Sequence, residues 1–258
     1  AAIELGRIEE DPALDLISYK GGSLTYMAFN TQKDPAKDEN LRKAVAHAID
    51  IDSIIAVAAE GRGEKATSFW GWDEFGFYDC GGYTRDLDKA KEYLAKAFPN
   101  GNAALDISVG ADRKTIAEMI QSDWAKVGVK AKIVSYEWGE YLSGMRKGEH
   151  DTALFGWMSD NGDPDNFADV LLGCDSIKTG SNAARWCDKE YNSLVQKAKL
   201  VSKPEERAAL YQQSQEIFYQ QAPWIALANG KTFYATRSNV SGYSVSLMGS
   251  DFSKAKLN

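Results

Sequence analysis

The sequence is poor in histidine, cysteine and proline: its 258 residues include 2 His, 3 Cys and 6 Pro. The sequence has only two histidines, His47 and His150, so it offers few side chains for a histidine-based catalytic triad or a zinc site. The sequence also lacks a His-Glu-x-x-His helix, a Gly-x-Ser-x-Gly elbow and a phosphate-binding loop. We therefore expect that the protein is not an enzyme and that it carries no cofactor and no metal.

Positive charge and long apolar runs are also in short supply. The 30 basic side chains are outnumbered by 37 acidic ones, for a formal charge of −7. A surface for nucleic acid or an anionic membrane would need a basic stripe, so neither is an expected partner. No apolar run approaches the roughly 20 residues of a membrane span. The opening Ala1-Ala2-Ile3-Glu4 contains no signal peptide, and we expect any export signal to have been removed.

An alternation of strand and helix patterns occupies the middle of the chain. Alternating apolar residues predict strands at 105–109 and 129–133, a short apolar run predicts a third at 153–157, and helical stripes lie between them at 116–127 and 138–145. Such a βαβαβ array predicts an α/β fold with a mostly parallel sheet and right-handed crossovers. Ligands of such sheets bind outside the carboxyl ends of the strands.

Further elements flank this array. Residues 14–30 read as two short strands broken at Gly21-Gly22, a pattern that by itself predicts a plain hairpin. His47 lies off the apolar stripe of its predicted helix, and we expect it at the surface. Helices are predicted over 38–49, 52–59, 86–97 and 188–200, and from a capping box at 202–205 to 221, with a strand at 224–228.

The predicted loop at 61–83 is dense in glycine and aromatic residues. It includes Phe69, Trp70 and Trp72. Aromatic side chains in a loop either pack onto the domain or line a cleft, and packing is the preferred interpretation.

A run of acids and turn formers, 160–166, follows directly after the strand at 153–157. At this place Asp160 can bind a ligand's ammonium group through charge-assisted hydrogen bonds. The backbone of residues 156–158 could pair with an extended peptide as an added strand, a mode that ignores side chains. Trp157 could wall a side-chain pocket. A calcium loop starting at Asp160 is disfavoured, because glycine and proline would stand where oxygen ligands are needed.

A structural role competes with ligand binding for the same acids. Asp160, Asp163 and Asp165 all precede a predicted helix near Asn166, where acidic side chains favour the N-terminus. We expect Asp163 or Asp165 to cap this helix and Asp160 to bind the ligand. The cysteines leave two alternatives open: Cys174 and Cys187 form one pair, or both are reduced and buried.

Several stretches of this chain resemble the dipeptide-binding members of the bacterial solute-binding proteins, family 5, that serve peptide ABC transporters. The likeness runs from about Gly21 nearly to the C-terminus. It rests on Gly156-Trp157, the run 160–167, the block Cys174…Ser181-Asn182…Arg185-Trp186-Cys187, and the stretches 117–129 and 136–141.

The resemblance implies roles for particular residues. Asp160 is the family's ammonium ligand, and residues Gly156, Trp157 and Met158 line the peptide site. The family carries a disulfide at the spacing of Cys174 and Cys187, which leaves Cys80 as a free thiol. The family's carboxylate-binding arginine lies in a longer loop than the one found here at 109–114, so Arg113 is only its possible substitute.

The resemblance also implies an organisation and a function. Family members are roughly twice as long, so we expect a fragment or an engineered domain: residues 1–30 as remnant and hinge of a first lobe, 31–222 as the second ligand-binding lobe, and 223–258 as the return to the first. The implied protein is a periplasmic substrate-binding component that delivers a dipeptide or short peptide to a permease. The alternatives are a receptor for haem or another small anion, and, ranked below it, a metal-assisted hydrolase.

Overall fold

The computed structural model describes residues 2–58, 61, 63–71, 74–179, 181–246 and 249–258. Within these residues no helix has the length and apolar character needed to cross a membrane. Trp72 and Gly180, both in segments that the sequence analysis singled out, lie outside the described residues.

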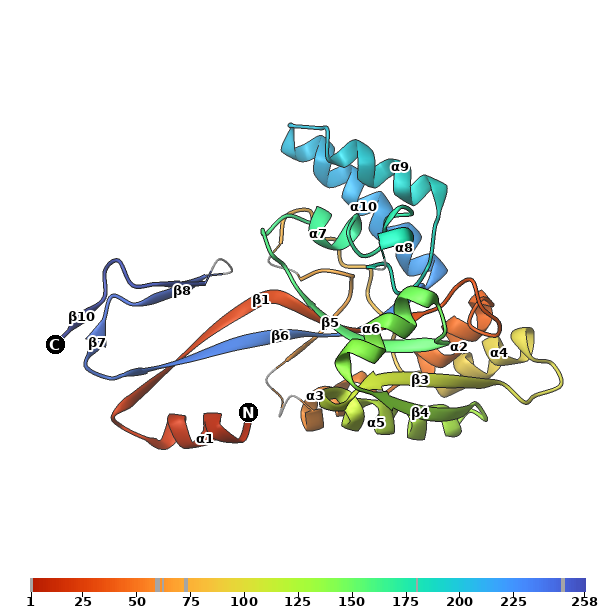
Figure 1. The fold of residues 1–258 in the computed structure, drawn as a ribbon, viewed down its shortest axis with the longest axis horizontal. Coiled ribbons are helices and arrows are strands. Elements are labelled where there is room, and N and C mark those ends of the chain that lie inside the picture. The colour runs from red at the N-terminus through yellow and green to blue at the C-terminus, as the bar shows by residue number, and fades with distance from the viewer. Residues whose placement is uncertain (1, 59–60, 62, 72–73, 180, 247–248) are drawn as a thin grey trace.

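A six-stranded mixed sheet forms the centre of the molecule (Figure 1). The order across the sheet is β2 (Glu64–Lys65), β6 (Trp224–Arg237), β1 (Leu14–Phe29), β5 (Thr152–Met158), β3 (Ala104–Gly110) and β4 (Lys130–Tyr136). The three strands of the predicted βαβαβ array, β3, β4 and β5, pair in parallel, as the sequence analysis predicted. β1 adds to β5 antiparallel, and β6 adds to β1 antiparallel.

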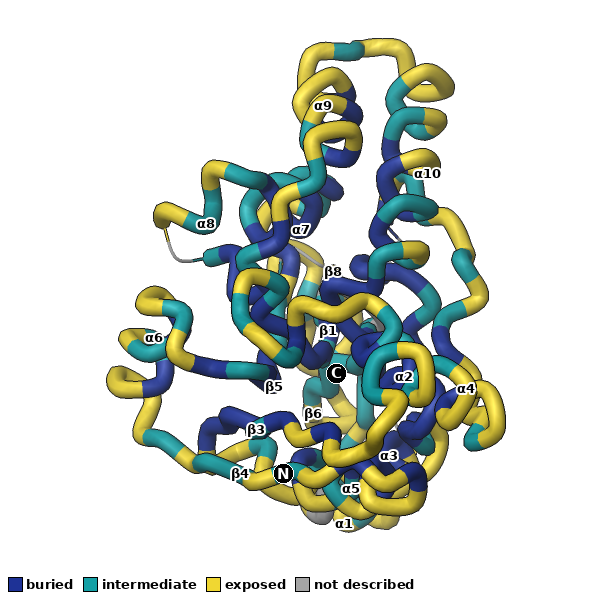
Figure 2. The backbone as a smooth tube through the Cα atoms, turned by 90° about the vertical axis from the view of Figure 1, so that its right-hand side faces the viewer, coloured by how far each residue is buried: buried dark blue, intermediate teal, exposed yellow. Residues whose placement is uncertain are grey.

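Helices cover both faces of this sheet because its central strands bury both of their faces. Met27 and Phe29 of β1 and Leu154 of β5 belong to one apolar core, whereas Tyr26 and Phe155 belong to the other. The first core is covered by α2 (Glu39–Ala48), α3 (Ile51–Ala58), α4 (Leu87–Ala97) and α5 (Lys114–Ala125). The second is covered by α6 (Trp138–Lys147), α7 (Asp165–Ala168), α9 (Lys189–Ala198) and α10 (Pro204–Gln221), with α8 (Ser176–Thr179) in the connecting loop. Figure 2 shows the buried strands between the exposed outer turns of these helices.

Aspartates start three of the helices at the predicted places. Asp38, Asp86 and Asp188 each accept a hydrogen bond from the amide three residues on, at the starts of α2, α4 and α9. The predicted capping box at 202–205 is wrong: α10 begins at Pro204, and no side chain caps it. Proline at this first position needs no partner for its missing N–H, so the helix begins there.

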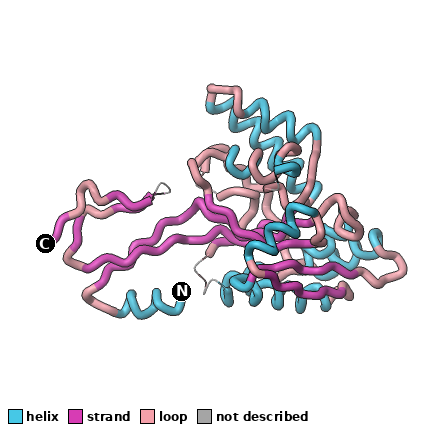
Figure 3. Tube along the Cα trace, viewed as in Figure 1, coloured by secondary structure: helices cyan, strands magenta, loops and turns pink. Residues whose placement is uncertain are grey.

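A two-stranded ribbon leaves the body of the molecule and carries both termini (Figure 3). It consists of residues 14–20 of β1 and 231–237 of β6, preceded by α1 (Ala2–Glu10). β1 is one continuous strand rather than two, but its ladder with β6 is interrupted between Lys20 and Leu24, where the two glycines lie. The assignment of residues 1–30 and 223–258 to another lobe stays a prediction. The tail adds β7 (Val240–Ser241), β8 (Ser244–Ser246), β9 (Gly249–Asp251) and β10 (Lys256–Leu257).

Of two predictions about side-chain burial, one is wrong and one is confirmed. His47 is buried, not at the surface: its Nδ1 lies 2.9 Å from the Thr84 carbonyl oxygen, and its ring packs against Tyr83 and Tyr93. The residues after α2 fold back over the helix and cover its polar side, which the helical periodicity could not reveal. Phe69 and Trp70 are fully buried in the second core, so these loop aromatics pack onto the domain.

Candidate ligand-binding site

The carboxyl ends of β3 and β5 define the candidate site. Although these strands are neighbours, they pair at two positions only, Ile107 with Thr152 and Ser108 with Ala153. Beyond these pairs the buried Tyr141 hydroxyl from α6 lies 2.7 Å from the Leu154 carbonyl oxygen and 3.2 Å from that of Ser108. The hydroxyl lies between the two strands at the point where their pairing stops. Consequently β1 is the one strand partner of residues 156–158 in the described part of the chain, and their other edge is free.

Arg113 reaches this free edge from the end of β3. It is the last residue of the short 3-10 helix Ala111–Arg113, and its guanidinium lies over Gly156. A Cβ on residue 156 would come within 2.5 Å of Arg113 Nη2, so only glycine permits this approach. The guanidinium also forms an ion pair with the exposed Asp112 carboxylate. The predicted residues Arg113 and Gly156 are therefore brought together, although they belong to different strands.

Asp160 lies just past the end of β5 and is tied to Trp157 by a third residue. Asn166 is buried, and its Oδ1 accepts hydrogen bonds from Trp157 Nε1 at 2.7 Å and from the Asp160 amide at 3.2 Å. Its Nδ2 donates to the Asp160 carboxylate at 3.3 Å. The Asp160 side chain itself is exposed. Asn166 thus holds the carboxylate at the strand end while leaving it open to a ligand.

The other two acids of the run have structural roles. The Asp163 carboxylate accepts the amide of Asp165, the first residue of α7, and forms an ion pair with Arg207 at 2.7 Å. Burial opposes ionisation, but the hydrogen bonds from Arg207 and Asp165 prevail and lower the pKa of Asp163. Burial and the neighbouring Asp163 charge raise the pKa of Asp165. Neither of the two expected residues is the N-cap of α7, which is Pro164 without a side-chain cap; Asp163 instead accepts the amide of the first residue of the helix.

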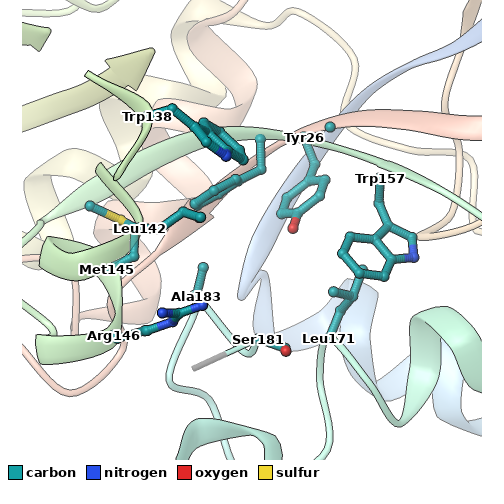
Figure 4. Close-up of a pocket in the computed structure, with 11 residues that line it drawn as sticks. Tyr26, Trp138, Leu142, Met145, Arg146, Trp157, Leu171, Ser181 and Ala183 are labelled. Carbon is teal, nitrogen blue, oxygen red and sulfur yellow. The ribbon is translucent and has the colours of Figure 1, made fainter. Parts of the chain in front are cut away.

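A pocket of about 270 Å³ opens beside Trp157 (Figure 4). Trp157 and Trp138 lie on opposite sides of it, and the Tyr26 ring lies between them. The lining comes from three elements and from the segments on either side of α8: Tyr26 of β1; Phe155, Gly156 and Trp157 of β5; Trp138, Leu142, Met145 and Arg146 of α6; Leu171 before α8; and Ser181 and Ala183 after it. Met158, the last of the predicted site residues, is exposed at the end of β5 and does not line this pocket.

The loop that closes one side of the pocket is held by the predicted disulfide between Cys174 and Cys187, which is present. Cys80 is a free, half-buried thiol, and burial raises its pKa to about 12. His150 also supports the loop: its Nε2 lies 2.7 Å from the Ala183 carbonyl oxygen, and burial lowers its pKa to about 4. Neither histidine lines the pocket.

Sequence reasoning missed three contributors to this site: Asn166, Tyr141 and Tyr26. Asn166 stood within the acidic run, but nothing in the sequence singled out its amide. Tyr141 belongs to the helical stripe predicted at 138–145, and its burial agrees with that prediction. The contact of its hydroxyl with two strands depends on tertiary structure, so the stripe could not predict it. The signal that could have found the pocket wall is the i, i+4, i+7, i+8 spacing of Trp138, Leu142, Met145 and Arg146.

Comparison with known proteins shows which family and which relatives this sequence is similar to. The sequence model described as bacterial extracellular solute-binding proteins, family 5, middle part, matches residues 2–179. The chain is 37% identical over 258 residues to the dipeptide-binding protein of Escherichia coli K12, covering 95% of this chain and 48% of that protein. It is 37% identical over 260 residues to heme-binding protein A of Haemophilus influenzae, covering 96% and 47%.

The structural comparison agrees. HbpA2 from Haemophilus parasuis superposes with a TM-score of 0.92 at 34% identity, covering 100% of this chain and 52% of that one. The chain thus spans about half the length of the curated relatives it matches.

Proposed function

The chain belongs to the bacterial extracellular solute-binding proteins of family 5, and on this premise we propose that it is one ligand-binding lobe of the periplasmic substrate-binding component of an ABC peptide importer. The ligand is a dipeptide or short peptide, which the complete receptor delivers to its permease. The receptor binds and releases its ligand without chemical change.

The observation that carries this proposal is the free backbone edge at residues 156–158, with opposite charges near it. An extended peptide can add to this edge and pair with its unused backbone groups. Asp160, just past the strand end, offers a carboxylate to the peptide's ammonium group. Arg113, over Gly156, offers a guanidinium to the peptide's carboxylate. The two ends of a short peptide are thereby recognised whatever its side chains are.

The test is calorimetric titration of the complete receptor with Ala-Ala. We expect Asp160→Asn to weaken binding by very roughly 30-fold to several thousandfold, because the ligand's ammonium loses its partner in a closed site. Asp175→Asn is the matched control, since the Asp175 side chain is 99% exposed and its ion-pair partner is Lys178. N-acetyl-Ala-Ala, which lacks the ammonium, should bind the parent and the Asp160 variant equally weakly. Unchanged affinity of the Asp160 variant for Ala-Ala would contradict the ammonium role.

Haem is the second candidate ligand, because heme-binding protein A is as similar to this chain in sequence as the dipeptide-binding protein. Both histidines are engaged with backbone carbonyls away from the pocket, so a histidine-ligated haem is not supported. Addition of hemin to the receptor and measurement of its absorbance band decides between the ligands. A shifted band that Ala-Ala abolishes would favour haem at the same site.

A further inference from the structure

One arginine ties the acidic run 160–166 to the helices α9 and α10. Arg207 lies near the start of α10, and its Nη2 donates to the Asp163 carboxylate at 2.7 Å and to the Tyr211 hydroxyl at 3.1 Å. Its Nε donates at 3.0 Å to the carbonyl oxygen of Ala198, the last residue of α9. A single side chain therefore joins two helices of the second core to the loop that follows β5.

The guanidinium of Arg207 is also packed against two aromatic rings. It lies 5.3 Å from the centroid of the Phe75 ring and 5.2 Å from that of the Tyr211 ring. Cation–π contacts and partial burial restrict its orientation, since the side chain is 21% exposed. An ion pair made by such a restricted guanidinium is stronger than a mobile surface pair, because less side-chain freedom is lost when it forms.

The other hydrogen bonds of residues 160–165 are local. The Asn161 side chain accepts the Asp163 amide at 2.9 Å, and the Asp163 carboxylate accepts the amide two residues further on at 3.0 Å. Among the described residues, Arg207 is the one side chain outside 157–170 that hydrogen-bonds to this segment. The local bonds shape the loop, and the arginine fixes it relative to the rest of the lobe.

The same contact decides which carboxylate of the run is open to a ligand. Asp163 is partly buried and neutralised by Arg207, whereas Asp160 is exposed and forms no ion pair within the described part of the chain. Without the arginine, a second free carboxylate would stand three residues from Asp160 on a loop with one anchor fewer. Part of the binding free energy of a ligand's ammonium would then be spent on ordering this loop.

We infer that Arg207 is a positioning residue of the ammonium site: without touching the peptide, it clamps Asp163 and thereby fixes the loop that presents Asp160 at the end of β5. This inference rests on the proposed function. It gives the start of α10 a part in peptide affinity, although Arg207 lies outside the pocket and away from the free strand edge.

The test is calorimetric titration of the complete receptor and three variants with Ala-Ala. Arg207→Met removes the charge and the donors, and should weaken binding about 3- to 30-fold, because the ammonium loses part of a charge-assisted hydrogen bond. Arg207→Lys keeps a cation beside Asp163 and should stay within about threefold of the parent. Lys203→Met is the matched control, since it removes a cation near the start of the same helix whose partner Glu206 is exposed. It should leave the affinity unchanged.

A second peptide distinguishes positioning of the ammonium site from general support of the lobe. N-acetyl-Ala-Ala lacks the ammonium, so its weak affinity, measured at high peptide concentration, should be the same for the parent and Arg207→Met. Asp163→Asn removes the charge of the pair and should reproduce part of the loss for Ala-Ala. The double variant should bind no more weakly than Arg207→Met alone, because both changes break the same contact. Thermal unfolding verifies that each variant folds.

The outcomes separate the two proposals. If Ala-Ala binds the parent and Arg207→Met with equal affinity, the positioning role is overturned and the peptide function stands. Equal losses for Ala-Ala and N-acetyl-Ala-Ala also overturn it, because Arg207 would then support the lobe rather than the ammonium site. A loss in Lys203→Met as large as that in Arg207→Met has the same consequence. If Ala-Ala does not bind the complete receptor, both proposals fail together.

Discussion

Single atoms of buried side chains organise the candidate site. Asn166 uses both ends of its amide, accepting from Trp157 and the Asp160 backbone and donating to the Asp160 carboxylate. Tyr141 places one hydroxyl between two strands and so ends their ladder. Neither side chain needs to touch a ligand. Each sets the position of a group that would.

Gly156→Ala tests the importance of one missing methyl group. The new Cβ would lie within 2.5 Å of Arg113 Nη2, and the flexible guanidinium should move away at little cost in stability. We expect peptide affinity to fall about tenfold, as for a weakened charged hydrogen bond. Calorimetry measures the affinity, and urea unfolding should change by less than about 1 kcal/mol. Gly139→Ala in α6 is the control, because its Cβ would meet no atom within 4 Å; equal affinities for the two variants would refute the close-approach argument.

His150 predicts a pH dependence of stability. Burial lowers its pKa to about 4, whereas the pKa in an unfolded chain is about 6.5. The unfolded chain therefore binds more protons between these pH values, so this contribution is fully present above about pH 6.5 and is lost as the pH falls toward 4. His150→Gln keeps an N–H donor for the Ala183 carbonyl but cannot titrate.

The measurement is urea unfolding of both proteins at pH 7.5 and pH 4.5. The parent should lose about 2–3 kcal/mol more than the variant on acidification. Equal losses would mean that His150 is not the titrating group.

Helix α6 and the disulfide loop act together as walls around the strand end. α6 turns one face toward β5 and ends at Gly148, where Arg185 packs closely against the glycine. The loop between Cys174 and Cys187 has little regular structure, with α8 as its helix. The disulfide and a few hydrogen bonds fix the conformation of this loop, as repeated backbone hydrogen bonds fix the conformation of a helix.

Replacement of Cys174 and Cys187 by serine should lower the free energy of unfolding by about 3 kcal/mol in the chain-entropy account of loop closure. Urea unfolding measures this loss, and hydrogen exchange should become faster at Ala183 and its neighbours before the sheet is affected. Cys80→Ser is the control. Its Sγ donates to the Gln215 carbonyl oxygen, a bond that serine can replace, so a smaller effect is expected. Equal effects of the two replacements would argue against a stabilising role of the bridge.

The whole molecule presents the candidate site at its surface. Trp138 and Met158 are more than half exposed, and Asp160 is open to water. The fully buried Phe69 and Trp70 contribute nothing to this face, in line with the preferred interpretation that the loop aromatics pack onto the domain. In the proposed receptor a second lobe would cover the site and exclude water, which strengthens its charge pairs.

Accordingly, the 258-residue chain alone should bind dipeptides very weakly. An ion pair open to solvent contributes about 0–1 kcal/mol, too little to hold a short peptide. Titration of the chain and of the complete receptor with Ala-Ala compares the two directly. Saturation of the chain at micromolar peptide would show that one lobe suffices and would refute the need for a second, covering lobe.

Local patterns in the sequence were enough to predict most of the elements and the strand end at which the candidate site lies. The period of apolar residues distinguishes strand from helix, and aspartates such as Asp38 and Asp188 mark helix starts, because these signals act between residues close in the chain. The parallel βαβαβ order follows from the same alternation, and it puts residues 156–160 at a ligand-binding edge. The disulfide was expected from family resemblance rather than from periodicity, whereas the proposed role of Asp160 rests both on that resemblance and on its place after the strand.

Tertiary structure alone decided the remaining features. The burial of His47 depends on the segment around Thr84, which packs back against α2. The approach of Arg113 to Gly156 depends on how the neighbouring strands β3 and β5 diverge. The pocket unites residues from Tyr26 to Ala183, which no local pattern relates. Contacts between segments this far apart are set by packing and by hydrogen bonds across the fold. They exist only once the strands and helices have taken their places.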